Sequence, residues 1–296
     1  MVQTKPKHEV VLVTGASSGL GLALSKLLLS TTEHKLILTA RESSLPRFEE
    51  QGIQQSERVW LRPLDILDNI QRRAIVREAE SKLGGITVLV NNAGLAYRSV
   101  VEHVTEEERL AQLGVNFCAP MEMTRLVLPT MRDKRHGRII NVSSVGGMMA
   151  MPTMATYSAS KFALEGASEA LWYEVKPWNV FVTLIQPGFI HSGSFQNTRR
   201  THASHISENS ELDAYHRHYQ FMGPFIAKAM DFALATPEKV AAKIAKTIEQ
   251  RRPPLRVPAT IDAHLFALLR RVLPRGIYHQ LLYCALPSIH KWGPSR

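Results

Sequence analysis

The chain has 296 residues, of which 45% are hydrophobic and 21% charged, and its formal net charge is +10. This composition is typical of a globular protein with enough apolar material for a core. Two cysteines, Cys118 and Cys284, are too few for a disulfide framework, so we expect a cytoplasmic setting. No apolar run approaches the roughly 18 residues of a spanning helix. The polar, basic segment 1–9 does not resemble a signal peptide.

The basic excess is concentrated at the C-terminal end. Residues 251–296 hold eight Lys or Arg side chains against one acidic residue, Asp262. The segment lacks the aromatic–basic surfaces of single-strand binders, and the chain shows no helix-turn-helix or zinc pattern. We therefore expect no nucleic acid partner.

Short β-branched runs alternate with longer amphipathic segments through the first two-thirds of the chain. Strands are expected at 9–14, 35–40, 59–64, 86–91, 138–143 and 180–186. Helices are expected at 19–30, 69–83, 106–132 with a kink at Pro120, and 155–175. Strands joined by such helices run parallel through right-handed crossovers, and nearly all-apolar strands are covered on both faces. The pattern predicts a doubly wound α/β sheet of the Rossmann type.

The pattern changes after Gly188. Residues 191–222 are rich in His, Ser and Asn and show no clear strand, so we expect a flexible polar lid over the site. The pairs His202/His205 and His216/His218 lack a strong ligand set, so no metal site is predicted.

After this segment, the rest of the chain is expected to contain three helices and one more strand. A helix at 237–250 with Thr236 as its cap, a final strand at 255–258, and apolar-basic helices at 261–273 and 277–286 are expected. We divide the chain into one catalytic domain, 1–254, and a C-terminal extension, 255–296.

A glycine-rich segment, T-G-A-S-S-G-L-G, runs from Thr14 to Gly21 between the first strand and the first helix. Glycines let backbone N–H groups approach a pyrophosphate, and the helix N-terminus adds partial positive charge. Such a loop alone is also compatible with a plain turn, but the strand before it and the helix after it favour a dinucleotide site. The residues expected to line this site are Gly15, Ser17, Ser18, Gly19, Leu20 and Gly21.

The end of the second strand indicates which dinucleotide binds. NAD sites carry an acid there for the ribose 2′-OH, whereas this strand ends Ala40-Arg41. An arginine can pair with a 2′-phosphate through its planar fork, and Ser17 is similarly placed. NADP(H) is therefore favoured over NAD(H), although Glu42 next to Arg41 weakens the case slightly.

A Y-x-x-x-K pattern, Tyr157 to Lys161, lies on an expected helix, where i and i+4 share one face. A phenol titrates near 10, and a neighbouring ammonium is expected to lower that pKa towards neutrality. Tyr157 could then exchange a proton with a carbonyl or alcohol oxygen. An exposed helical pair is the alternative for this pattern taken by itself.

Further motifs follow in a fixed order, and together they resemble the short-chain dehydrogenase/reductase family. They are the glycine loop at 14–21, N-N-A-G at 91–94, Y-x-x-x-K at 157–161 and P-G at 187–188. The resemblance implies an oxidoreductase that transfers a hydride to or from a nicotinamide dinucleotide.

The resemblance also implies catalytic roles. Ser144, preferred over its neighbour Ser143 by spacing, would bond the substrate oxygen, and Tyr157 would deliver the proton. Lys161 would tune Tyr157 and hold the nicotinamide ribose, and Asn116 would bind a water that links Lys161 to solvent.

Cofactor roles follow in the same way. Asp65 would contact the adenine amino group, and Asn92, Ala93 and Gly94 would shape the floor under the adenosine ribose. The residues implied around the nicotinamide, besides Tyr157 and Lys161, are Pro187, Gly188, Ile190 and Ser192. Ser192 stands where the family has threonine, which keeps the hydroxyl.

The substrate is less well defined by the sequence. Methionines between 148 and 154 could form a pliable wall for a hydrophobic substrate or ordinary packing. We expect reduction of a hydrophobic ketone or aldehyde, with oxidation of a lipid- or steroid-like alcohol as the alternative and a non-catalytic nucleotide-binding regulator as the third. The extension either contacts a membrane surface or packs on the protein, and the resemblance implies a homo-oligomer, dimer or tetramer.

Overall fold

The computed structural model describes residues 8–191 and 198–293. Its centre is a seven-stranded, wholly parallel sheet with the order β3-β2-β1-β4-β6-β7-β9. These strands are β1 (Val10–Val13), β2 (Lys35–Ala40), β3 (Val59–Pro63), β4 (Val88–Asn91), β6 (Gly137–Val142), β7 (Val180–Gln186) and β9 (Arg256–Pro258). A small second sheet pairs β5 (Tyr97–Arg98) with β8 (Arg199–Arg200). The predicted doubly wound fold is confirmed.

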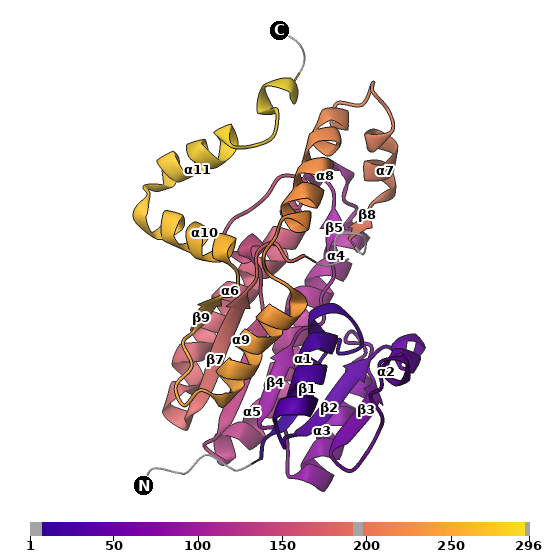
Figure 1. Ribbon diagram of the computed structural model, residues 1–296, viewed down its shortest axis with the longest axis vertical. Helices are drawn as coiled ribbons and strands as arrows, with labels where there is room; N and C mark the ends of the chain where they lie inside the picture. The colour runs from indigo at the N-terminus through magenta and orange to yellow at the C-terminus, as the bar shows by residue number, and fades with distance from the viewer. Residues whose placement is uncertain (1–7, 192–197, 294–296) are drawn as a thin grey trace.

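Helices cover both faces of the large sheet (Figure 1). The α-helices of the described residues are α1 (Gly19–Thr31), α2 (Pro46–Glu50), α3 (Asn69–Leu83), α4 (Glu106–Leu113), α5 (Ala119–Asp133), α6 (Ala155–Val175), α7 (His202–Glu208), α8 (His216–Asp231), α9 (Pro237–Glu249), α10 (Ile261–Val272) and α11 (Arg275–Cys284). In the view of Figure 1, α7 and α8 rise on one side of the upper half, and α10 and α11 lie on the other.

The two faces of the sheet carry separate cores because successive side chains of a strand point to opposite sides. Val11 and Val13 pack with α1 and α9, whereas Val10 and Leu12 pack with α3, α5 and α6. Burial on both faces explains why the strands are apolar throughout rather than alternating.

Side chains at the helix ends fix where several helices begin. The carboxylate of Asp68 accepts the backbone N–H groups of the first turn of α3, and Thr105 and Glu108 form a capping box at α4. Thr236 caps α9, as its sequence predicts, and Pro237 occupies the first turn.

The expected long helix is helical throughout but irregular at one turn. A π-helical turn over Gly114–Cys118 joins α4 to α5, and it lies directly before Pro120, where the sequence predicts a kink. Pro120 has no N–H to donate to the carbonyl of Asn116. The turn widens where this hydrogen bond is missing, and the buried Asn116 within it is bonded to Leu95.

The segment after Gly188 is more regular than the sequence indicates. Residues 198–222, expected to form a flexible lid without strands, contain β8, α7 and the first part of α8. Strand β9 adds to the edge of the large sheet beside β7. The sheet therefore continues past residue 254, and α10 begins directly after it.

The extension packs on the protein along part of its surface. Met148 and Met149 are buried against Tyr278 of α11, with Phe266 and Leu269 of α10 around them. Other side chains of the same helices are exposed, among them Leu265 and Leu268. The packing alternative is confirmed for one face of the extension.

Candidate active site

Two cavities adjoin at the carboxyl ends of the strands, near the point where the strand order reverses between β1 and β4. Open α/β sheets bind ligands at such a point. The glycine-loop cavity has a volume of about 450 Å³ and is lined by residues of the loop between β1 and α1. The Tyr157 cavity has a volume of about 370 Å³. Both are bounded by Leu20, Asn92, Gly94 and Leu95, so the two cavities are adjacent.

Backbone geometry makes the glycines of the loop necessary. Gly15 has a φ of +64°, and a Cβ on Gly21 would lie 2.2 Å from the carbonyl oxygen of Gly15. The side-chain amide of Asn92 donates to the carbonyl oxygens of Thr14, at 2.9 Å, and Gly15, at 3.0 Å. The hydroxyl of Thr14 accepts the N–H groups of Asn92 and Ala93, both at 3.0 Å. The glycine loop and the N-N-A-G segment therefore form one hydrogen-bonded unit.

Most of the residues predicted to bind the adenosine half of a dinucleotide lie in this cavity. Its lining includes Gly15, Ser17, Ser18, Leu20, Arg41, Asp65, Asn92, Ala93 and Gly94. Gly19 and Gly21 shape the loop and the start of α1 instead.

One end of the glycine-loop cavity is basic. Arg41 and Arg47 line it together with the hydroxyls of Ser17 and Ser44, whereas Glu42 is not among the described lining residues. Arg47 and Ser44 were missed because they lie in and beside α2, a five-residue helix too short to show periodicity. Pro46 at its first turn was the available signal.

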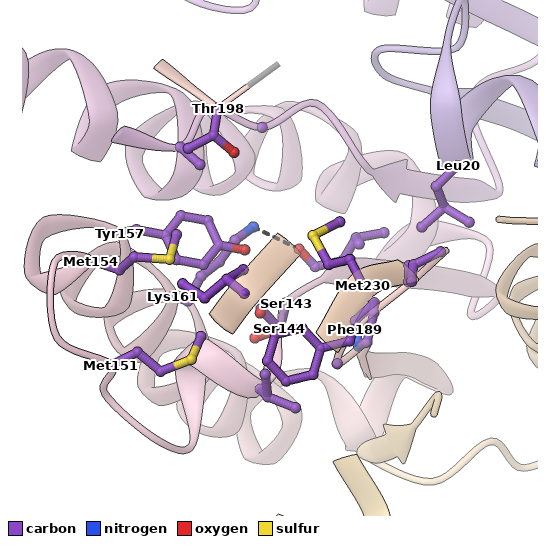
Figure 2. Close-up of a pocket in the computed structure, with 18 of the residues that line it drawn as sticks. Leu20, Ser143, Ser144, Met151, Met154, Tyr157, Lys161, Phe189, Thr198 and Met230 are labelled. Carbon is purple, nitrogen blue, oxygen red and sulfur yellow. Dashed lines mark hydrogen bonds between the residues drawn. The ribbon is translucent and has the colours of Figure 1, made fainter. Parts of the chain in front are cut away.

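Tyr157, Lys161 and Ser144 meet in the second cavity (Figure 2). Tyr157 and Lys161 stand one turn apart on α6, and the Lys161 Nζ lies 5.8 Å from the centre of the Tyr157 ring. Lys161 Nζ donates to the carbonyl oxygen of Val142 at 2.9 Å, the dashed line in Figure 2. Ser144 hydrogen-bonds Tyr157. Ser143 lines the same cavity and stays a competitor for this role.

Burial, rather than the neighbouring ammonium, controls the acidity of the phenol. Burial raises the pKa of Tyr157 above its ordinary value, and the hydrogen bond with Ser144 opposes this only in part. The predicted fall in this pKa is therefore wrong for the observed arrangement. Burial also lowers the pKa of Lys161 to about 8, although Glu165 favours its charged form. At neutral pH the site holds a protonated phenol beside an ammonium.

Asn116 lies in the π-helical turn and is 1% exposed. Its amide nitrogen donates to the carbonyl oxygen of Leu95 at 2.7 Å and to the Ser160 hydroxyl at 2.9 Å. Its oxygen accepts the Leu95 N–H at 2.8 Å. Asn116 thus joins the wall shared by the two cavities to the helix that carries Tyr157 and Lys161.

The loop after β7 forms another wall of the Tyr157 cavity through Pro187, Gly188 and Ile190. The start of the C-terminal extension holds this loop. Gly188 N donates to the Thr260 hydroxyl at 2.8 Å, and Phe189 N donates to the Asp262 carboxylate at 2.9 Å. A Cβ on Gly188 would lie 1.8 Å from that carboxylate. Ser192, the last residue predicted for the nicotinamide, lies outside the described residues.

The remaining lining of the Tyr157 cavity is mostly apolar. Met151 and Met154 lie on the side of Tyr157, and Phe189 and Met230 lie across from them in Figure 2. Met230 belongs to α8, so the segment expected to be a polar lid contributes an apolar wall. Of the four methionines between residues 148 and 154, Met151 and Met154 therefore line the cavity, whereas Met148 and Met149 pack on the extension.

Residues 8–191 and 198–293 contain neither a metal site nor a membrane-spanning helix. No three His, Cys, Asp or Glu side chains of these residues gather closely enough to hold a metal ion. Within the same ranges, none of the helices combines the length and apolar character needed to span a bilayer.

The family model described as short chain dehydrogenase matches residues 9–203, which include both cavities' main motifs. The chain belongs to this family and is an oxidoreductase acting on CH–OH groups.

Two relatives and a solved structure resemble the chain over most of its length. It is 35% identical over 275 residues to a 3-ketodihydrosphingosine reductase of Bacteroides thetaiotaomicron, covering 93% of this chain and 96% of that protein. It is 31% identical over 257 residues to the 17-beta-hydroxysteroid dehydrogenase type 1 of Homo sapiens, covering 83% and 76%. A short-chain dehydrogenase from Streptomyces avermitilis has a similar structure, with a TM-score of 0.75, 28% identity, and 94% and 98% coverage.

Proposed function

We propose that this oxidoreductase uses NADP(H) to reduce a hydrophobic ketone or aldehyde to an alcohol. The observation that carries the proposal is the junction of the two cavities at Leu20, Asn92 and Gly94. A dinucleotide in the glycine-loop cavity would extend its nicotinamide past this junction to Tyr157. NADPH, when bound, supplies the hydride.

The basic end of the glycine-loop cavity supports NADP(H) over NAD(H). Arg41 and Arg47 offer planar, charged donors, and Ser17 and Ser44 add hydroxyls. A 2′-phosphate accepts bonds from both kinds of donor. We expect NADPH to bind more tightly than NADH, and Arg41→Ala and Arg47→Ala to reduce this difference. Dissociation constants from fluorescence titration measure it, and tighter NADH binding by the unaltered enzyme would refute the preference.

Tyr157 would deliver the proton to the carbonyl oxygen. Its raised pKa keeps the phenol protonated at neutral pH, which suits a proton donor. Ser144, already bonded to Tyr157, would bond the same substrate oxygen. Lys161 would hold the nicotinamide ribose and stabilise the phenolate that forms, and Asn116 would keep α6 in register with the cavity wall.

The other residues inferred from the family pattern would hold the cofactor. Asp65 would contact the adenine, and Ala93 would lie under the adenosine ribose. Pro187, Gly188 and Ile190, with Ser192, would form the nicotinamide pocket.

The protonation state of Tyr157 supports a direction for the reaction. The apolar walls of the Tyr157 cavity and the relatives support a substrate class. A protonated Tyr157 favours reduction, whereas oxidation of a lipid- or steroid-like alcohol needs a phenolate and remains the alternative. Two relatives are named as a 3-ketodihydrosphingosine reductase and a 17-beta-hydroxysteroid dehydrogenase. The apolar walls around Met151, Met154 and Phe189 support a substrate of similar hydrophobicity.

A panel of hydrophobic ketones with NADPH tests the proposal directly. Tyr157→Phe removes the proton and should lower kcat by a factor of at least about 100, the usual contribution of a positioned acid. Tyr173→Phe is the matched control, because Tyr173 lies on the same helix and is 63% exposed. Unchanged turnover by Tyr157→Phe would refute the role of the phenol.

The exposed face of the extension supports peripheral contact with a membrane surface. Leu265, Leu268 and Leu281 are about half exposed, and Arg271 adds positive charge beside them. Deleting residues 255–296 would also remove β9 and the bonds to the loop after β7. The sharper test is Leu265→Asn with Leu268→Asn, which should reduce binding to anionic vesicles; equal binding would refute the contact. We also expect a homo-oligomer, which the mass in solution would test.

A further inference from the structure

A buried carboxylate lies one helical turn beyond Lys161, and the proposed reaction does not use it. Tyr157, Lys161 and Glu165 follow one another at intervals of four residues on α6, so their side chains share one face of the helix. Glu165 is only 6% exposed. An ionised carboxylate is costly to bury unless other groups stabilise its charge. The groups around Glu165 therefore bear on its role.

Both carboxylate oxygens of Glu165 are bonded to segments beside the active site. Oε1 accepts the side-chain amide N–H of Gln186 at 2.9 Å, and Oε2 accepts the Nε–H of Arg256 at 3.1 Å. Gln186 is the last residue of β7 and directly precedes Pro187, which lines the Tyr157 cavity. Glu165 thereby ties α6 to the loop after β7.

The loop that carries Ser144 packs on the same part of α6. A Cβ on Gly147 would lie 2.7 Å from the Ser143 hydroxyl oxygen and 2.9 Å from Cγ of Glu165. It would also lie 3.1 Å from the carbonyl oxygen of Lys161. Glycine at this position lets the loop approach the helix closely. Glu165 is thus a point where both loops of the cavity meet α6.

The Tyr157 cavity contains cations but no carboxylate to balance them. Among the described residues that line it, the charged side chains are Arg98 and Lys161, and neither Asp nor Glu is present. Burial keeps the phenol of Tyr157 protonated at neutral pH by raising its pKa. Glu165 is the charged group whose attraction opposes the effect of burial on the pKa of Lys161.

Arg256 does not cancel the negative charge beside Lys161, because two carboxylates share it. Its second guanidinium nitrogen donates to Glu169, one turn further along α6, at 2.6 Å. The guanidinium is also 41% exposed, whereas the Glu165 side chain is 8% exposed. Two carboxylates and one guanidinium leave one negative charge uncompensated on this side of the helix.

We propose that Glu165 is a positioning residue for the reaction, whose carboxylate keeps Lys161 charged beside Tyr157 and holds α6 against the two loops of the cavity. The inference rests on the proposed function, in which Lys161 stabilises the phenolate that forms when Tyr157 delivers its proton. Without the charge on Lys161, that phenolate has no counter-charge on its own helix.

The protonation of Lys161 tests the inference without turnover. Carbon-13 NMR of the full-length enzyme labelled at lysine Cε follows each ammonium group as the pH rises, and Lys161→Met identifies the signal of Lys161. Because burial lowers the pKa of Lys161 to about 8, the unaltered enzyme should titrate there. Glu165→Gln keeps the shape but removes the charge, so it should lower the midpoint by about one further pH unit. An unchanged midpoint would overturn the inference.

Arg256→Gln should shift the same midpoint in the opposite direction, because it leaves the Glu165 carboxylate without its cation. A general loosening of the fold would not give opposite shifts in the two variants. Glu174→Gln is the matched control, since Glu174 is an exposed residue of the same helix, and it should leave the midpoint unchanged. A shift in Glu174→Gln equal to that in Glu165→Gln would refute the specific role. Should Glu165→Gln not fold, a midpoint that does not rise in Arg256→Gln would refute it.

Turnover separates this inference from the proposed function. With hydrophobic ketones and NADPH, kcat/KM of Glu165→Gln should begin to fall about one pH unit lower than in the unaltered enzyme, and Glu165→Asp should recover part of the difference. Reduction with the same pH profile in Glu165→Gln and the unaltered enzyme would sustain the reductase and refute the role of Glu165. A shifted Lys161 midpoint, with none of the ketones reduced, would sustain the effect of Glu165 on Lys161 and refute the reductase.

Discussion

Gly188 and Asp262 are predicted to be energetically coupled, because one carboxylate both restricts the glycine and holds the loop. Gly188→Ala would place a Cβ 1.8 Å from Oδ2 and 2.4 Å from Cγ of Asp262. Asp262→Ala would remove the acceptor of the Phe189 N–H, which it bonds at 2.9 Å. Each substitution disturbs the loop that walls the Tyr157 cavity.

The magnitudes follow from these contacts. Overpacking of this kind costs about 1–3 kcal/mol. Loss of a hydrogen bond to a charged acceptor costs about 1.5–3 kcal/mol, and the half-buried position of Asp262 reduces this towards about 1 kcal/mol. In the double variant the new methyl group at position 188 no longer overlaps with the carboxylate of Asp262, because that carboxylate is absent. Its added cost should fall below about 0.5 kcal/mol, which makes the double variant more stable than the sum of the two single changes.

Urea unfolding followed by circular dichroism measures the four free energies of the cycle, and NADPH titration reports whether the loop still supports cofactor binding. Gly166→Ala is the control for a new methyl group. No neighbouring atom lies within 4 Å of the Cβ it would add on α6, so it should be neutral or stabilise by up to about 1 kcal/mol. Additivity of Gly188→Ala and Asp262→Ala within about 0.5 kcal/mol would refute the coupling.

Three further results are expected. Because burial lowers the pKa of Lys161 to about 8, kcat/KM for reduction should be constant near neutral pH and fall as the pH rises past 8; a profile still flat well above pH 8 would contradict this. Asn116→Ala should lower the free energy of unfolding by about 1–3 kcal/mol, since the N–H of Leu95 loses its acceptor while the Leu95 carbonyl keeps the bond from Gln112; no measurable loss in urea unfolding would contradict it. Gly21→Ala should weaken NADPH binding about tenfold or more, because its Cβ would lie 2.2 Å from the Gly15 carbonyl oxygen; an unchanged dissociation constant would argue against it.

The large sheet and the glycine loop could be predicted because their causes are local. Nearly all-apolar strands, such as β1 and β7, require cover on both faces. The helices between the strands are long enough to serve as crossovers between parallel neighbours. The loop at 14–21 requires glycine at positions where φ is positive or two backbones touch, as at Gly15 and Gly21. Each of these features can be recognised from the residue types at a few consecutive positions.

Features that depend on distant partners could not be predicted. The pKa of Tyr157 rises because of burial by segments far apart in the sequence, whereas the spacing to Lys161 indicated only the nearby charge. Arg98 lines the Tyr157 cavity, and its strand β5 pairs with β8 (Arg199–Arg200), which lies far along the chain. The polar composition of 198–222 concealed α8, whose buried face includes Met222 and Ile226 among exposed charges.

The four methionines between residues 148 and 154 connect the Tyr157 cavity to the extension. Met151 and Met154 line the cavity, while Met148 and Met149, a turn earlier, are buried against α10 and α11. The opposite wall, after β7, is bonded to the first residues of α10. A change in the packing of the extension therefore moves two walls of the Tyr157 cavity without touching Tyr157. Substitutions that loosen Tyr278 should consequently alter KM for the ketone more than kcat, because the proton donor on α6 keeps its place.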